Sequence, residues 1–488
     1  MMKPHNTTHG VFHILLVALV ILGLLGVLSA CKPHPVSCKP APAEASPARH
    51  AEDTQAVTAD TTTRADRDAD DADANAQAGA SMQATSTTDA FYYSDAAQAS
   101  NTVSAVLQRF TEQRKEQLQR LAESLGIKVP AAFDMYLEAV KGNDWNVASN
   151  MYEQLRLFCG QYADSVEDAE IRTPLWQAIM EIHWAWEYAH AWGPVGTLTY
   201  VQELYKPITE NSLYLGGTDP GRFLATAFQS EVARNGIAIM TQNALADNNY
   251  IKYASAIALQ GSGAPANLTQ AEFRKGYADY AKEVEQRRAN GETVDGITIA
   301  GGKITVYGIA EVMRVNSILA RTLWEKNKDA HDVFVEESFV VPWMYEYLEP
   351  AGPIMKLSRG KSELTSDKVN QDSAYWDSVE CGLVPHVGDP LNLTFAKMRS
   401  AIAGLYENRN MLREAEHAYQ QAVRLAPAAA EPSVRYAAML ANVGRYDEAH
   451  AIVNECRRFN PDMQKLADFN AQLDQIQKQK QKQKQAGH

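Results

Sequence analysis

The 488-residue sequence predicts a mixed α and α/β fold, and three patterns along the chain lead to that prediction. Across residues 91–205, apolar side chains recur at intervals of three and four, as in amphipathic helices. Across residues 206–360, short β-rich runs alternate with helical stretches, which is typical of an α/β domain with a largely parallel sheet. Residues 396–461 resemble themselves at a period of 34, which indicates stacked helical hairpins.

The first region is expected to contain helices from Asp95 to Gly126, from Pro130 to Gly142, from a cap at Asp144, and from Thr173-Pro174 onwards. In the last of these helices, His183 and His190 lie seven residues apart and therefore share one face. Catalytic metal sites usually need three protein ligands, and no third ligand is indicated. We therefore expect these histidines to pack in a core with the tryptophans beside them; an aromatic groove for a peptide or sugar is the alternative.

Glycines and polar residues follow three of the expected strands in the central region. In open α/β sheets, ligands bind beyond the carboxyl ends of the strands, so these residues would meet at one rim of a Rossmann-like domain. The glycines permit close backbone approach, and the helix after them could receive a phosphate at its N-terminus. The candidate ligand-binding residues are Gly216, Gly217, Thr218, Asp219, Arg222, Gln242, Asn243, Asp247, Glu336 and Glu337.

Simpler interpretations of this rim stay open. Asp219-Pro220 is also an ordinary cap and first-turn pair, which would only start a helix. Glu336 and Glu337 are adjacent and would point to opposite faces of a strand, so they cannot form one acid and base pair and could be a solvated acidic rim. No GxSxG elbow, HExxH motif or phosphate-binding P-loop is present. The sequence therefore names no catalytic residue, metal or cofactor.

Residues 396–461 match the spacing of tetratricopeptide repeats, in which small residues let two helices approach and a proline ends the unit. Corresponding positions 34 residues apart are Ala415 and Ala449, Tyr419 and Val453, Ala422 and Cys456, and Pro427 and Pro461. Arg399 departs from this pattern, because an aromatic residue usually takes its position. Two repeats are fewer than the three normally needed alone, so we expect them to pack on the α/β domain or on a capping helix. That helix and a polar tail are expected within 462–488, and a connector within 361–395.

The stretches 215–223, 241–247 and 335–339, with Trp343-Met344-Tyr345, resemble an uncharacterised family of bacterial envelope proteins in which an α/β segment precedes tetratricopeptide repeats. The segment is also similar to the soluble C-terminal region of mannosyltransferase-like membrane proteins. This likeness, over residues 125–460, implies the same architecture and a glycan-related setting. It does not imply glycosyl transfer, because those larger proteins would use a polytopic membrane region that this sequence does not predict.

Residues 1–30 are typical of an export signal. An uncharged apolar run extends from Ile14 to Leu28, which is short for a bilayer-spanning helix of about 20 residues; a retained transmembrane anchor is the alternative. The sequence Leu28-Ser29-Ala30-Cys31 resembles the lipobox of bacterial lipoproteins, which implies that Cys31 is cleaved free and acylated with chains such as palmitate. Lys32 after the cysteine implies the outer membrane, with the protein facing the periplasm.

Residues 31–90 are expected to form a disordered tether between the anchor and the folded part. From 32 to 90 the sequence contains no Ile, Leu, Phe, Tyr or Trp, so it cannot bury enough apolar surface to offset the entropy of ordering. As a flexible coil it would span on the order of 40 Å. The net charge of −13 is spread along the chain without a basic patch, which argues against nucleic acid as a partner.

The sequence supports two functional hypotheses. The first is a non-catalytic, lipid-anchored scaffold of the cell envelope that holds a protein partner through residues 396–461. The second is a binding protein or enzyme that takes a glycan or sugar phosphate at the strand ends. Both hypotheses hold the chain on membrane lipid through acylated Cys31.

Replacing Cys31 tests the anchor. We expect Cys31→Ala to release the mature chain from membranes, or to leave it uncleaved, because no acyl chain can then be attached. Membrane fractionation with an antibody to the folded part measures both outcomes. A variant that is processed normally and still sediments with membranes would contradict this prediction.

Overall fold

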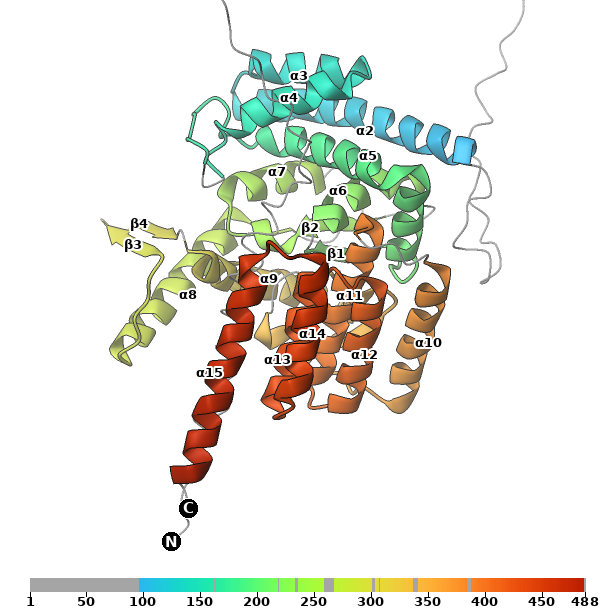
Figure 1. The fold of residues 1–488 in the computed structure, drawn as a ribbon. Helices are drawn as coiled ribbons and strands as arrows, with labels where there is room; N and C mark the ends of the chain where they lie inside the picture. Colours follow the sequence, from blue (N-terminus) through green and yellow to red (C-terminus); the bar gives the residue numbers. More distant parts are fainter. Residues whose placement is uncertain are drawn as a thin grey trace, which may run out of the picture.

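The computed structural model describes residues 96–161, 164–217, 219–232, 236–258, 267–300, 303–306, 308–336, 341–383 and 388–486. The expected export signal, Cys31 and the tether lie outside these residues. Figure 1 shows a layer of helices above a small sheet, and further helices below it that end in a projecting C-terminal helix. The described part is mostly helical, with a five-stranded mixed sheet. Within the described ranges, every helix falls short of the length or apolar character that a bilayer crossing requires.

The upper layer confirms the helices expected in the first region. They are α2 (Ala96–Leu125), α3 (Ala131–Lys141), α4 (Trp145–Arg156) and α5 (Trp176–Tyr205). The side chain of Asp144 accepts a hydrogen bond from the Val147 amide at 3.2 Å, which is the expected cap of α4. α5 bends at Gly193, whose φ of 68° is left-handed, and Pro194 follows inside the helix. This bend turns the second half of α5 down toward the sheet (Figure 1).

The central sheet has the strand order β2-β1-β5-β7-β6. β1 (Leu213–Gly216) lies between β2 (Ala238–Thr241) and β5 (Val333–Val335), and both pairings are parallel. Its register pairs Gly216 with Thr241, and Leu215 with Val335. The carboxyl ends of these three strands therefore lie at one edge, as the sequence predicts for the ligand rim.

The rest of the sheet differs from the predicted largely parallel arrangement. β7 (Ile354–Leu357) runs antiparallel to β5 and forms a hairpin with β6 (Leu348–Ala351). The expected helix around Pro342 to Leu348 is only a 3₁₀ turn, η3 (Pro342–Met344), before β6. Gly352-Pro353 forms the two-residue hairpin turn, with Gly352 at a φ of 61°, which is the turn chemistry that the helical interpretation missed.

The β-rich pieces around Gly301-Gly302 do not join the central sheet. They form a separate antiparallel pair, β3 (Ile297–Ala300) and β4 (Lys303–Val306). This pair lies beside α8 at the left edge of Figure 1. The remaining helices of the central region are α6 (Asp219–Phe228), α7 (Asn248–Ala258), α8 (Gln270–Ala289) and α9 (Ile309–Asn327). Of these, α6 packs against α5 on one side and against β1 and β2 on the other.

The C-terminal part consists of helical hairpins that repeat in both position and backbone geometry. Leu412 and Tyr446, 34 residues apart, begin α12 (Leu412–Leu425) and α14 (Tyr446–Phe459), which are equal in length. Their partners are α11 (Pro390–Asn408) and α13 (Ala430–Asn442). The turns between partners use left-handed residues at equivalent positions, Asn410 (φ 58°) and Gly444 (φ 87°). The expected connector 361–395 is not simply a linker, because it contains α10 (Ser366–Gly382).

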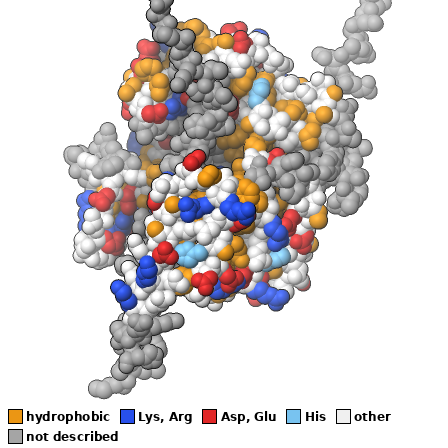
Figure 2. Space-filling view, in the orientation of Figure 1, with side chains coloured by type: hydrophobic (Ala, Val, Ile, Leu, Met, Phe, Trp, Pro, Cys, Tyr) orange, Lys and Arg blue, Asp and Glu red, His pale blue; other side chains and the backbone are white. Residues whose placement is uncertain are grey.

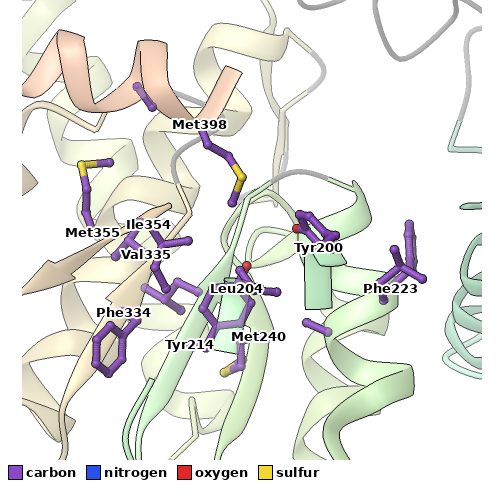
Figure 3. Close-up of a cluster of buried hydrophobic side chains, with 14 of the residues drawn as sticks. Tyr200, Leu204, Tyr214, Phe223, Met240, Phe334, Val335, Ile354, Met355 and Met398 are labelled. Carbon is purple, nitrogen blue, oxygen red and sulfur yellow. The ribbon is translucent and has the colours of Figure 1, made fainter. Parts of the chain in front are cut away.

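The repeated hairpins pack on both of the expected supports. α11 contacts α5, β6 and β7, and its residue Met398 reaches the cluster around Met355 and Ile354 (Figure 3). On the other side, α15 (Gln464–Ala486) packs on α13 and α14 through its buried residues Leu466, Phe469 and Leu473. Beyond them α15 carries only polar residues until Ala486 and projects from the body (Figure 1). The hairpins are therefore fused to the sheet layer.

Arg399, which departs from the repeat pattern, is buried in a polar network. Its Nη1 donates to Asp372 Oδ2 of α10 at 2.6 Å, and its Nε donates to Gln421 Oε1 of α12 at 2.9 Å. The guanidinium also lies over the ring of Trp376, with 5.3 Å from Cζ to the ring centroid. Arg399 thus joins α10 to the first hairpin, which explains why an aromatic residue is absent there.

Removing this arginine tests the network. We expect Arg399→Leu to lower the free energy of unfolding by about 3–5 kcal/mol, because Asp372 is left as an uncompensated buried charge. The matched control is Arg424→Leu, which breaks a half-exposed pair with Glu380 and should cost no more than about 1 kcal/mol. Urea unfolding measures both. Equal losses in the two variants would contradict the prediction.

Candidate ligand site at the strand ends

Glu336 is a buried carboxylate directly after β5. Its backbone amide donates to Leu215 O at 3.0 Å, which continues the pairing with β1. Its side chain is only 2% exposed and accepts hydrogen bonds from the hydroxyls of Tyr214 at 2.6 Å and Tyr200 at 3.5 Å. Burial, and then the negative charge of Glu336, raise the pKa of Tyr214 well above its usual value. Tyr214 therefore stays protonated and donates to the carboxylate.

The carboxylate of Glu336 lies against the first turn of α6. A Cβ placed on Gly221 would come within 1.5 Å of Glu336 Oε2, so only glycine leaves room for it. A Cβ on Gly216 would lie 3.0 Å from the carbonyl oxygen of Gly221, so that glycine permits close packing of β1 and α6. The N-terminus of a helix carries partial positive charge and favours an anion. The anion position that the sequence predicts here is therefore filled by a side chain of the protein itself.

Arg222 does not join this rim, because its side chain turns back toward α5. Its Nη2 donates to Gln177 Oε1 at 2.7 Å and lies 3.4 Å from Glu181 Oε1. Glu181 also accepts from Arg114 of α2 at 2.8 Å and from Tyr253 of α7 at 2.7 Å. All of these side chains are buried. Arg222 thus belongs to a network that binds α2, α5, α6 and α7 together.

The turn after β2 places two candidate residues beside β1. Asn243, in η2 (Gln242–Ala244), donates from Nδ2 to the carbonyl oxygen of Gly217 at 2.8 Å. Asn316 of α9 holds the turn in place: its Nδ2 donates to Asn243 O at 2.8 Å, and its Oδ1 accepts from the Ala246 amide at 2.6 Å. The side chain of Gln242 is fully buried, and neither its Nε2 nor its Oε1 has a hydrogen-bond partner among the described residues.

Asp247 lies away from this group. Its Oδ1 accepts from the Asn249 amide at 2.9 Å, so it caps α7 as the sequence predicts. Its Oδ2 accepts from Gln161 at 3.1 Å and lies 3.7 Å from Arg172 Nη1, both in the segment that joins α4 to α5. Asp247 is therefore a structural residue of the α7 start.

The structure thus brings together only part of the predicted set. Gly216, Gly217, Asn243 and Glu336 meet at the end of β1, with Gln242 beside them. Thr218, Glu337 and the side chain of Asp219 lie outside the described residues. Tyr214 was not predicted as a site residue, although it shares a strand face with Gly216 by the two-residue period. Tyr200 and Asn316 come from distant helices, and no local pattern could have placed them here.

The histidines of α5 pack in an aromatic cluster, as expected. The ring of His183 stacks on Tyr152 with centroids 3.5 Å apart, and His190 stacks on Trp145 at 5.0 Å. Among the described residues, no group of three or more His, Cys, Asp or Glu side chains is arranged to hold a metal ion. Comparison of the chain with protein-family models, with curated proteins and with solved structures gave no match. The strand-end residues are therefore interpreted from their geometry alone.

Gly221 offers a test of the contact between Glu336 and α6. We expect Gly221→Ala to lower the free energy of unfolding by about 1–3 kcal/mol, because the added methyl must displace the carboxylate or the helix. The control is Gly360→Ala, at an exposed glycine with no atom within 4 Å of the new Cβ, where we expect a change within about 0.5 kcal/mol. Urea unfolding measures both variants. If Gly221→Ala is as stable as the control, the close contact is not present in solution.

Proposed function

We propose that this chain is a lipid-anchored cell-envelope protein that binds a small polar ligand, a glycan or a sugar derivative, at the strand ends of a Rossmann-like domain. The parallel strands β2, β1 and β5, with α6 entering directly after β1, support that domain assignment. The anchor at Cys31 and the outer-membrane location rest on the sequence alone. Binding, without catalysis, is the activity proposed.

The observation that carries the proposal is the buried side chain of Gln242. A primary amide offers two donors and an acceptor, and buried polar groups in folded proteins are almost always paired. Leaving one unpaired costs about 1–3 kcal/mol. A chain that keeps this group enclosed gains by it if a ligand supplies the missing partners. Gln242 follows β2, and Glu336 follows β5, on the two sides of β1.

This position is suited to a ligand rich in hydroxyl groups. The backbones of β2 and β5 are separated by two strand spacings, or about 10 Å. Asn316 and Asn243 fix the turn that carries Gln242, so the amide is held in place before a ligand arrives. Such preorganisation reduces the ordering entropy that binding must overcome. A hydroxyl can both donate to and accept from an amide, and it therefore satisfies both ends of Gln242.

Replacing Gln242 separates a ligand-binding role from a structural one. We expect Gln242→Met to leave the unliganded protein as stable as wild type, or more stable by about 1–3 kcal/mol, because an unpaired buried amide is removed at similar volume. We also expect wild type to gain thermal stability from at least one member of a panel of sugars, nucleotide sugars and sugar phosphates. The same ligand should not stabilise Gln242→Met. Thermal unfolding measures all of these effects.

Gln421 provides the matched control. It is also fully buried, but its Oε1 accepts from Arg399 and its Nε2 donates to Asp377 Oδ1 at 2.7 Å. Gln421→Met should therefore destabilise the protein, whereas Gln242→Met should not. If both substitutions destabilise the protein equally, Gln242 already has a partner within the protein, and the ligand proposal loses its main support.

A second role, as a protein-interaction scaffold, is supported by the repeated hairpins if they are tetratricopeptide-type. The inner helix α11 is packed on the sheet and α13 is buried along nearly its whole length, so a partner would have to use other surfaces of residues 396–461. Leu412 and Val443, 40% and 45% exposed, lie beside equivalent turns of the two hairpins and offer an apolar edge. Around them, Lys, Arg, Asp and Glu are interspersed on the face that Figure 2 shows. Purified partner complexes that survive Leu412→Asp and Val443→Asp would rule out this edge.

A further inference from the structure

The electrostatic surroundings of α6 limit the charge that a ligand can carry. The carboxylate of Glu336 already lies at the first turn of α6, where a phosphate would otherwise be favoured. Asp219, the first residue of the same helix, adds a second acid to that turn by its position in the chain. A phosphate brought to this helix end would therefore meet at least one negative charge already in place.

The buried charges next to this turn balance one another. Arg222 and Arg114 are paired with Glu181 in the network behind α6. Together with Glu336 they make two buried cations and two buried anions, all less than 7% exposed. Each arginine has carboxylate or amide oxygens within reach on α5, so neither extends toward the strand ends. The region offers no surplus positive charge for an anion.

We propose that the ligand of the strand-end site is uncharged, an unphosphorylated saccharide or related polyol, and that Glu336 acts as an electrostatic filter against phosphorylated forms. This inference rests on the proposed function and narrows its ligand class. Gln242 recognises hydroxyl groups by hydrogen bonding. Glu336, being enclosed, selects through its charge, because charge repulsion in a poorly hydrated site is weakly screened.

The first experiment compares matched ligands on the wild-type protein. Glucose, mannose and N-acetylglucosamine are titrated beside their 1-phosphates and inorganic phosphate, with thermal shift and calorimetry as readouts. We expect at least one free sugar to bind, and its phosphate to bind at least tenfold more weakly. A phosphate that binds as tightly as its parent sugar, or more tightly, would overturn the inference and leave the proposed binding function standing.

The second experiment vacates the carboxylate position. Glu336→Ala removes a group whose distal part has the shape of acetate, so acetate should return to the space and restore thermal stability. Acetamide, which has nearly the same shape without charge, should bind at least fivefold more weakly, because the end of α6 favours an anion. Wild type should respond to neither. Equal rescue by both molecules would show that the position does not select charge, which would overturn the inference.

The two experiments distinguish failure of the inference from failure of the proposed function. If no sugar or phosphate binds and Gln242→Met is destabilised like Gln421→Met, the ligand site itself is wrong, and the inference falls with it. If Glu336→Ala does not fold, the wild-type comparison still decides the question, since it requires no variant. Gain of sugar-phosphate binding by Glu336→Ala, at least tenfold over wild type, would be the strongest support.

Discussion

The contact between the Glu336 carboxylate and the first turn of α6 is the constraint on which the strand-end region depends. A carboxylate that is 2% exposed must be stabilised by donors and positive charge, and here two tyrosine hydroxyls and a helix terminus supply them. The close approach then requires glycine at 221, and the packing of that turn on β1 requires glycine at 216. The Gly-Gly-Thr-Asp-Pro-Gly sequence is thus explained by contacts within the protein before any ligand is considered.

The same principle joins the larger parts of the molecule. One buried arginine and glutamate network holds α6 to the upper helices, and another holds α10 to the first hairpin through Arg399. Buried ion pairs contribute little net stability, since desolvation offsets their attraction, but they strongly penalise arrangements that leave one partner unpaired. Between the two networks, the apolar cluster of Figure 3 joins α5, the sheet and α11 in one core. Apolar burial supplies the stability and the networks fix which helices meet.

How much the sequence could predict depended on the distance over which each signal acts. Helix ends such as the Asp144 cap, and the 34-residue period of the hairpins, are written in neighbouring residues and were predicted well. The Gly352-Pro353 hairpin was missed, because an apolar aromatic run before it also suits a helix. The site was predicted in part: the strand-end rule placed Glu336 correctly, whereas Arg222 looked equally suitable and turns away. Its partners on α5 lie more than 40 residues away, and no local pattern reports them.

The parallel pairing of β1 has a consequence for the order in which the chain can fold. Leu213 pairs with Ala238 soon after it in the chain, but also with Val333, 120 residues later. Until β5 is synthesised and delivered, β1 has an open apolar edge that can pair with another chain. The long loop between these strands also makes their pairing a late and slow step. A chain that crosses a membrane from its N-terminus onward would therefore need that edge kept apart from other chains until residue 335 has arrived.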